Sequence, residues 1–354
     1  MNTTFVILSD ISRQSTVIVS YITCFVSTIS VCLAVYLIKT ESLKEKKVFQ
    51  NALIYLQISL YISQTFWGTC CCAIFYFPFP AFISHGLLKN VLPFWVSGGI
   101  WGVLFTFYIQ SSLNILLVRL SIVVRPDSPF NFNKMSTFIF LMLYLISLVS
   151  FMLVLDLQLN FTHESMLNFL SDKYPGYIYI ANIYGAMIFS EFTAMKLLFS
   201  SMLGFAIFIL ISHSIFRYLI YYEIKMQVNK MSNFQQKYHM RIAKTLSIFV
   251  LIYTLCIAFY LLWSLVSNLL DSMWNTIRER YFGKVKIFEN SFLFAAITST
   301  FHTIFVGSPI AGTIYMISSN TAYLRRVKQL LRLKSEPNIR HPTIAVFKTS
   351  NIIT

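Results

Sequence analysis

The strongest constraint on this sequence is a series of seven long apolar stretches separated by short polar segments. The hydrocarbon core of a bilayer is about 30 Å thick, and a helix needs about 20 apolar residues to cross it. Only 12% of the residues are charged, which is about half the share found in soluble domains. The sequence therefore predicts an all-α membrane protein, a seven-transmembrane helix bundle.

The predicted helices form one membrane domain, because the remaining residues suffice only for loops and tails. We expect an amino-terminal tail at 1–16, a transmembrane domain at 17–318, an amphipathic helix at 319–334 and a disordered tail at 335–354. The seven helices are predicted at 17–38, 48–75, 94–123, 136–155, 194–222, 246–270 and 292–318. In the last helix, Gly307, Ser308 and Pro309 permit a kink, since proline frees a backbone carbonyl.

The distribution of Lys and Arg predicts the orientation of the bundle. The loops and tail on one side of the predicted membrane carry 20 of these residues, and those on the other side carry 8. Cytoplasmic loops are enriched in positive charge, so we expect the amino terminus outside and the carboxyl terminus in the cytoplasm. Two N-x-S/T sequons, at Asn2 and Asn160, fall on the external side and are predicted glycosylation sites.

The segment after the seventh predicted helix has the pattern of a basic amphipathic helix. Its apolar residues share one helical face, and they are Tyr323, Val327, Leu330 and Leu331. Its basic residues lie elsewhere on the surface, and they are Arg325, Arg326, Lys328 and Arg332. Such a helix is suited to lying along an anionic inner leaflet, and a solvated tail is the alternative.

Charge placement argues against several functions. The second, third, sixth and seventh predicted helices contain no Asp or Glu, whereas pumps and ion-coupled transporters keep ionisable groups at mid-membrane depth. A receptor for amines would also need a buried carboxylate. The histidines show no metal-ligand spacing and no catalytic set is evident, so we expect no enzyme activity, no metal and no cofactor. The basic residues sit at the ends of apolar segments, which argues against nucleic-acid binding.

The six cysteines all lie in or beside apolar stretches. None falls between the fourth and fifth predicted helices, so no disulfide can hold that loop to the third helix. A pairing of Cys24 with one of the cysteines at 70–72 would require their Cα atoms to approach within about 7 Å. We expect buried thiols that pack as small apolar groups instead.

The outer half of the predicted bundle is aromatic with few polar groups, which suits a pocket for a small, weakly polar ligand. The candidate ligand-binding residues are Gln64, Trp67, Trp101, Phe105, Tyr108, Tyr260, Trp263, Asn268, Thr298 and His302. Packing and interface positions are the competing explanation, because aromatic residues make up 17% of the chain. We therefore expect under half of these residues to touch a ligand.

The chain resembles the nematode serpentine chemoreceptors of the Str superfamily, and its motifs are similar to those of class H or class I. The order and spacing of several short segments carry the resemblance: 36–43 after the first predicted helix, 231–238 before the sixth, and Asn290, 300–303 and 323–325 in and after the seventh. The helix layout agrees over nearly the whole chain.

The resemblance implies a G-protein-coupled receptor for odorants or pheromones, placed in the plasma membrane of a sensory cilium. A heterotrimeric G protein would bind a basic inner surface lined by Arg119, Arg125, Lys237, Arg241 and Lys244. These residues could instead act only as orientation signals. A ligand-gated channel subunit, whose amino terminus would lie inside, and a membrane transporter remain the alternative functions.

Overall fold

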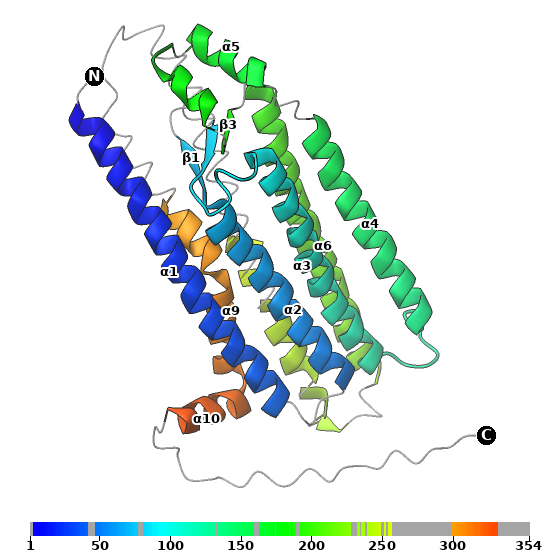
Figure 1. Ribbon diagram of the computed structural model, residues 1–354. Coiled ribbons are helices and arrows are strands. Elements are labelled where there is room, and N and C mark those ends of the chain that lie inside the picture. Colours follow the sequence, from blue (N-terminus) through cyan, green and yellow to red (C-terminus); the bar gives the residue numbers. More distant parts are fainter. Residues whose placement is uncertain are drawn as a thin grey trace, which may run out of the picture.

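The computed structural model describes residues 3–41, 47–76, 81–131, 133–158, 163–173, 175–183, 185–188, 192–227, 232–233, 235–237, 239–248, 251–252, 254–256 and 299–331. Long helices run side by side, with a small sheet at one end of the bundle and a short helix, α10, at the other (Figure 1). We call these the sheet end and the α10 end.

The long helices follow the apolar stretches of the sequence. They are α1 (Thr3–Glu41), α2 (Lys47–Thr65), α3 (Phe94–Val123), α4 (Lys134–Gln158), α6 (Phe192–Met226) and α9 (Ser308–Ser319), the last preceded by helical residues 299–306. The predicted bounds of α3 are confirmed, and those of α4 and α6 are met within four residues. The sixth helix was predicted to start at residue 246, but residues 239–248 are already helical, so it starts at least seven residues earlier. Its part beyond 256 lies outside the described residues.

The first helix was predicted to start at residue 17, but it starts at Thr3. The segment 3–16 contains neither proline nor glycine, so nothing in it interrupts the helical backbone. Its apolar span, Gln14–Glu41, still begins close to the predicted position. The polar start of α1 is therefore a helical extension of the transmembrane segment.

The prediction for the second helix was wrong at its carboxyl end, which was placed at residue 75. The helix passes into a π-helical turn, η1 (Phe66–Cys71), and ends at Cys72, which has a left-handed φ of 38° and donates its N–H to the Trp67 carbonyl at 2.7 Å. Residues 73–76 then form a strand, because Ile, Phe and Tyr favour extended structure and the prolines beyond them cannot continue a helix.

Hydropathy identifies membrane-crossing helices within the described part of the chain. Three are long and apolar enough to span a bilayer, namely Gln14–Glu41, Phe94–Val123 and Ile207–Met226. A fourth span arises if the bent pair Ser299–Val306 and Ser308–Ser319 is counted as one helix. The pair is bent by 49° at Gly307, next to Pro309, so the kink predicted from the sequence is confirmed.

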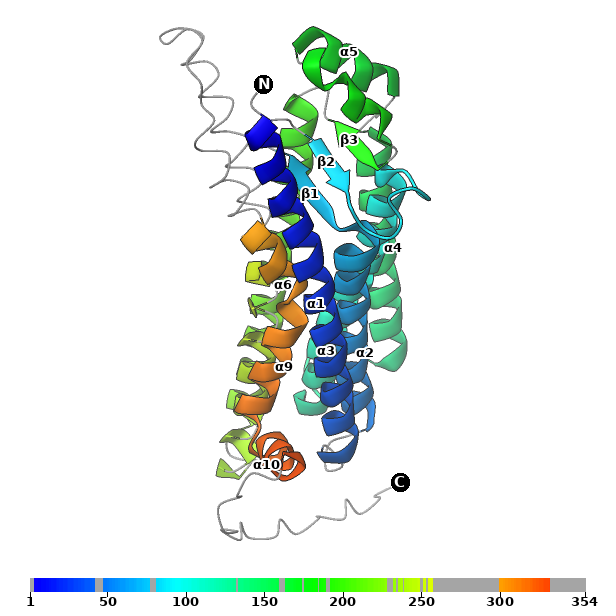
Figure 2. The same ribbon diagram turned by 60° about the vertical axis from the view of Figure 1, so that its left-hand side comes forward.

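Helix α3 is the central helix of the bundle (Figure 2). In its most apolar window, 72% of the residues are buried, against 28% for each of the other two complete spans. Polar contacts join it to its neighbours: the Ser59 and Ser111 hydroxyls of α2 and α3 are 2.6 Å apart, and the Gln110 amide donates to the Leu141 carbonyl of α4 at 3.2 Å. Such bonds satisfy polar groups that lipid cannot.

A three-stranded antiparallel sheet covers the sheet end. Its order is β1 (Ala73–Tyr76), β2 (Ala81–Ser84) and β3 (Ala186–Ile188), and β3 comes from the segment between α4 and α6. Because strand side chains alternate, the paired residues Phe82 and Met187 join the bundle core. Their neighbours face the other way and form a second core with α5 (His163–Lys173) and η2 (Pro175–Asn182). This cap was not predicted.

The amphipathic helix after the last span is confirmed as α10 (Thr321–Leu330). The Asn320 side chain caps it by accepting a hydrogen bond from the Ala322 N–H at 3.0 Å. Arg326 ties the helix to the end of α1, because it donates to the Tyr36 hydroxyl at 2.9 Å and lies 3.6 Å from the Glu41 carboxylate. Its association with a membrane surface stays a prediction, and residues 332–354 lie outside the described part.

All six cysteines are free. Cys24, Cys71 and Cys72 are buried, as expected for thiols that pack as apolar groups, whereas Cys32 is exposed and Cys70 and Cys256 are half-buried.

A close approach of three segments occurs at Gly68 in η1. The Ser20 hydroxyl of α1 donates to the Gly68 carbonyl at 2.9 Å. A Cβ on Gly68 would lie 2.6 Å from the Cys24 sulfur and 2.7 Å from Cγ1 of Val306, both shorter than real contacts allow. Only glycine therefore fits between α1 and the last span at this level.

We predict that Gly68→Ala destabilises the protein, because the added methyl group overpacks this contact by about 1–3 kcal/mol. The control is Gly98→Ala on α3, where nothing lies within 4 Å of the added Cβ. Melting temperatures of the two purified variants in nanodiscs should separate them, with Gly68→Ala alone lower than the wild type. Equal melting temperatures would contradict this description of the contact.

Candidate functional site

Four aromatic rings meet below the sheet, and we call them the aromatic cluster: Trp67 of η1, Trp101 and Phe105 of α3, and Phe305 of the helical segment before α9. The ring centroids of the two tryptophans are 4.6 Å apart. Trp101 stacks on Phe105 at 5.2 Å and meets Phe305 edge-on at 6.1 Å. These are favourable aromatic geometries, and all four side chains are buried.

Three further predicted residues surround this cluster. Gln64 lies one helical turn before Trp67 and is 1% exposed. The Tyr108 ring is 5.9 Å from that of Phe105, and His302 lies one turn before Phe305, with Nε2 3.4 Å from the Ser20 hydroxyl. The structure thus brings six of the ten predicted residues to one region. The other four lie outside the described residues: Tyr260, Trp263, Asn268 and Thr298.

Phe305 was missed by the sequence reasoning. It lies three residues after His302, so helical spacing places both on one side of the last span. A search for residues one turn from each predicted site would have found it. The seventh helix therefore contributes an aromatic ring to the cluster as well as its histidine.

The sheet closes the cluster at the sheet end through a continuous series of rings. Phe94, the first residue of α3, meets Trp67 edge-on at 6.3 Å. The same ring stacks on Phe82 of β2 at 5.7 Å, with an interplanar angle of 11°. The cap and the cluster consequently form one packed unit, so a displacement of the sheet would also displace the Trp67 ring.

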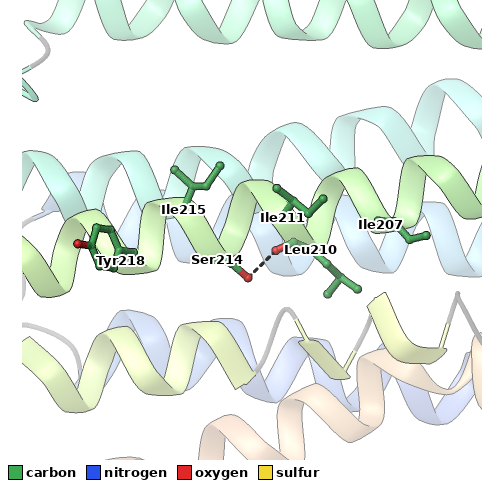
Figure 3. Close-up of a pocket in the computed structure, with 6 residues that line it drawn as sticks. All are labelled: Ile207, Leu210, Ile211, Ser214, Ile215 and Tyr218. Atoms are coloured by element: carbon green, nitrogen blue, oxygen red, sulfur yellow. Dashed lines mark hydrogen bonds between the residues drawn. The ribbon is translucent and has the colours of Figure 1, made fainter.

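A shallow groove of about 420 Å³ runs along α6 and is a weaker candidate site (Figure 3). Its only side-chain hydroxyl near the centre, Ser214, already donates to the Leu210 carbonyl at 2.8 Å. The other lining residues are Leu210, Ile207, Ile211, Ile215 and Tyr218, and the last four are about half or more exposed. An outward aliphatic face of this kind is what lipid chains require, so we assign the groove to lipid contact.

At the α10 end, Arg119 of α3 is buried, with 1% of its surface exposed. Its Nη2 donates to Nδ1 of His239 at 2.8 Å, and its guanidinium lies over the Phe49 ring at 5.4 Å. Because a guanidinium can only donate, the imidazole must accept and is therefore neutral. Arg119 was predicted to face a protein partner, and it would have to leave this contact to do so.

His239 lies before Leu246, where the sixth span was predicted to begin. Burial, and to a lesser extent the charge of Arg119, together lower the pKa of His239 to about 4. A histidine with a lowered pKa binds protons more readily in the unfolded chain. The contribution of the contact between Arg119 and His239 to the free energy of unfolding is therefore fully present above pH 6.5 and is lost as the pH falls toward 4.

A second polar cluster at the α10 end holds α3 to α6. The buried carboxylate of Glu223 accepts hydrogen bonds from the Arg125 Nε at 3.1 Å and from the Ser128 hydroxyl at 2.6 Å. The Gln227 side chain adds a bond to the Val123 carbonyl. Arg125, predicted to face a G protein, is thus engaged within the protein. Glu223 was missed, although it is one of only 13 acidic residues in the chain.

The three remaining basic candidates form an exposed face. Lys237, Arg241 and Lys244 are spaced by four and three residues on a helical stretch, so they lie on one side of it. All three side chains are exposed at the α10 end of the bundle. In the conformation described, these three are the exposed members of the predicted G-protein-facing set, whereas Arg125 is half-buried and Arg119 is buried.

We predict that Glu223→Ala lowers the free energy of unfolding by about 1–3 kcal/mol, because the buried Ser128 hydroxyl loses its acceptor. Asp127→Ala is the matched control, since Asp127 also lies near Arg125, at 3.8 Å, but is 77% exposed. It should change stability by less than about 0.5 kcal/mol. Thermal unfolding of both variants in nanodiscs tests this, and equal effects would contradict the assigned role of Glu223.

Comparison with known proteins adds an independent line of evidence. A family model described as serpentine type 7TM GPCR chemoreceptor Srh matches residues 12–333, which is more than nine-tenths of the chain. No curated protein matches the sequence. The match agrees with the helical fold and decides between the two receptor classes suggested by the motifs, in favour of class H. The chain therefore belongs to the Srh family of serpentine seven-transmembrane G-protein-coupled chemoreceptors.

Proposed function

We propose that this chemoreceptor binds a small, weakly polar molecule at the aromatic cluster and signals to a heterotrimeric G protein at the α10 end. The family supports the receptor class. The observation that carries the proposal is that α3 contributes residues both to the proposed ligand site and to the contact at the α10 end. Trp101 belongs to the aromatic cluster and Arg119 to the contact with His239. Their separation of 18 positions corresponds to about 27 Å of helix.

The chemistry of the cluster supports a neutral ligand. No charged residue occurs in η1 or in α3 before Arg119. A charged ligand in such a setting would lose its hydration without gaining a counter-ion, which costs several kcal/mol. Aromatic rings instead stabilise apolar and weakly polar molecules through contact area.

The proposed signal is a shift between two arrangements of α3 and the helix that holds His239. In the arrangement described, Arg119 is buried and bound to His239. A ligand can change the balance only through its different affinities for the two states. Parting of this contact would expose Arg119 beside the basic face formed by Lys237, Arg241 and Lys244.

The orientation follows from the charge distribution, with the sheet end outside and the α10 end in the cytoplasm. In this orientation α10 lies along the inner leaflet, where its exposed last residue, Leu330, and the following Leu331 face lipid. Glycosylation at Asn2 and Asn160, both outside the described residues, stays a prediction. We place the receptor in the plasma membrane, with the sensory cilium as its proposed site.

We predict that replacing Lys237, Arg241 and Lys244 together with Ala weakens coupling. The basic face would then lose its attraction for an acidic partner surface, while the core of the bundle is untouched because all three side chains are exposed. Agonist-stimulated nucleotide exchange on the G protein, measured with purified receptor, is the readout.

The control replaces the same positions so that charge is retained, as Lys237→Arg, Arg241→Lys and Lys244→Arg, and should couple normally. If the residues act only as orientation signals, the Ala variant loses surface expression but each remaining receptor couples as the wild type does. That result would refute the proposed contact.

A further inference from the structure

Three polar side chains in and beside the aromatic cluster are buried without a partner among the described residues. Gln64 is 1% exposed, and Trp67 and Trp101 are each 6% exposed. Within the described part of the chain, neither atom of the Gln64 amide and neither indole nitrogen has a hydrogen bond. Gln64 and Trp67 are one turn apart, and the two indole rings are in contact at 4.6 Å. The three groups therefore belong to one neighbourhood.

The amide nitrogens of two other glutamines of the same bundle do have partners. The Gln110 amide donates to the Leu141 carbonyl, and the Gln57 amide donates to the Met316 sulfur at 3.8 Å. A buried hydroxyl can turn onto the carbonyl of its own helix, as Thr106 does at 2.6 Å. An indole N–H or a glutamine amide has no such local option.

Leaving these groups unpaired is costly. A buried polar group without a partner loses about 1–3 kcal/mol, and lipid offers no replacement for water. Native proteins keep few such groups, and those they keep often serve a ligand or a functional state. The unpaired set therefore indicates what a bound molecule would have to supply.

The donor and acceptor inventory defines that molecule. Each indole offers one N–H, and the Gln64 amide offers two, so four donor hydrogens stand against a single carbonyl acceptor. Because donors exceed acceptors, a ligand that pairs with these groups must supply an oxygen that accepts their hydrogen bonds. Since no charge lies in η1 or in α3 before Arg119, this oxygen is not ionised.

We propose that the receptor recognises neutral carbonyl compounds, such as ketones, aldehydes, esters or lactones. The carbonyl oxygen accepts hydrogen bonds from the indole N–H groups of Trp67 and Trp101 and from the amide of Gln64. The apolar remainder of the ligand packs among the rings of the aromatic cluster. This inference rests on the proposed function, because it assigns a ligand class to the same site.

The first arm of the test needs no ligand. Gln64→Met and Gln110→Met remove an amide with little change of shape, one unpaired and the other bonded to Leu141. In nanodiscs without ligand, Gln64→Met should melt at or above the wild-type temperature and Gln110→Met below it. If Gln64→Met is destabilised as much as Gln110→Met, the amide has a structural partner and the proposal is overturned.

The second arm measures binding by tryptophan fluorescence and thermal shift. The probes are methyl ketones and methyl esters of graded chain length, each beside the alkane, primary amine and carboxylate of the same length. Trp101→Phe keeps the ring and removes the N–H, and should weaken binding of the carbonyl probes roughly 5- to 100-fold. Trp95→Phe is the matched control, since Trp95 is 49% exposed, and should leave binding unchanged.

The outcomes separate the two claims. Binding of alkanes as tight as that of carbonyl probes, or unchanged carbonyl binding by Trp101→Phe, overturns the ligand class while the receptor function stands. Tighter binding of the amine or carboxylate probes than of the carbonyl probes also overturns the ligand class while the receptor function stands. If no probe of any class binds the wild-type receptor, the proposed binding of small, weakly polar molecules fails together with the ligand class.

Discussion

The structure depends on the burial of α3. A bilayer cannot satisfy polar groups, so a transmembrane helix with polar and charged residues must be enclosed by protein. Helix α3 carries Arg119, Gln110 and several serines, and it is far more buried than the other complete spans. Its neighbours α2, α4 and α6 surround it, and each supplies a polar contact or an ion pair along its length or at its end. Rings of the aromatic cluster and Arg119 thus share one helix.

Most of the fold could be predicted from the length of the apolar runs. A run long enough to cross a bilayer has few alternatives to a helix, and the bounds of α3 were correct for that reason. The apolar residues after η1 were predicted to continue the second helix, because a short apolar run has no periodicity that distinguishes a helix from a strand. The cap of β3, α5 and η2 depends on pairing between distant loops, which no local pattern encodes.

Contacts within the site could be derived where two side chains share a helix, whereas spacing along the chain does not show which side chains of different helices touch. Trp101 and Phe105 are one turn apart, so their proximity follows from spacing alone. The contact of Arg119 with His239, and that of Glu223 with Ser128, join residues about a hundred positions apart. The sequence identified Arg119 and Arg125 as basic groups at a membrane boundary, but it could not show that both are engaged inside the protein. Tertiary packing turned two surface candidates into internal contacts.

We propose that the contact between Arg119 and His239 keeps the α10 end closed until a ligand binds. The most direct test is the distance between spin labels introduced at Ser121 on α3 and at Lys244, both exposed positions, in nanodiscs with and without an agonist. We expect agonist to lengthen this distance, and His239→Ala to lengthen it without agonist. An unchanged distance in a receptor that activates its G protein would contradict the proposed parting of Arg119 from His239.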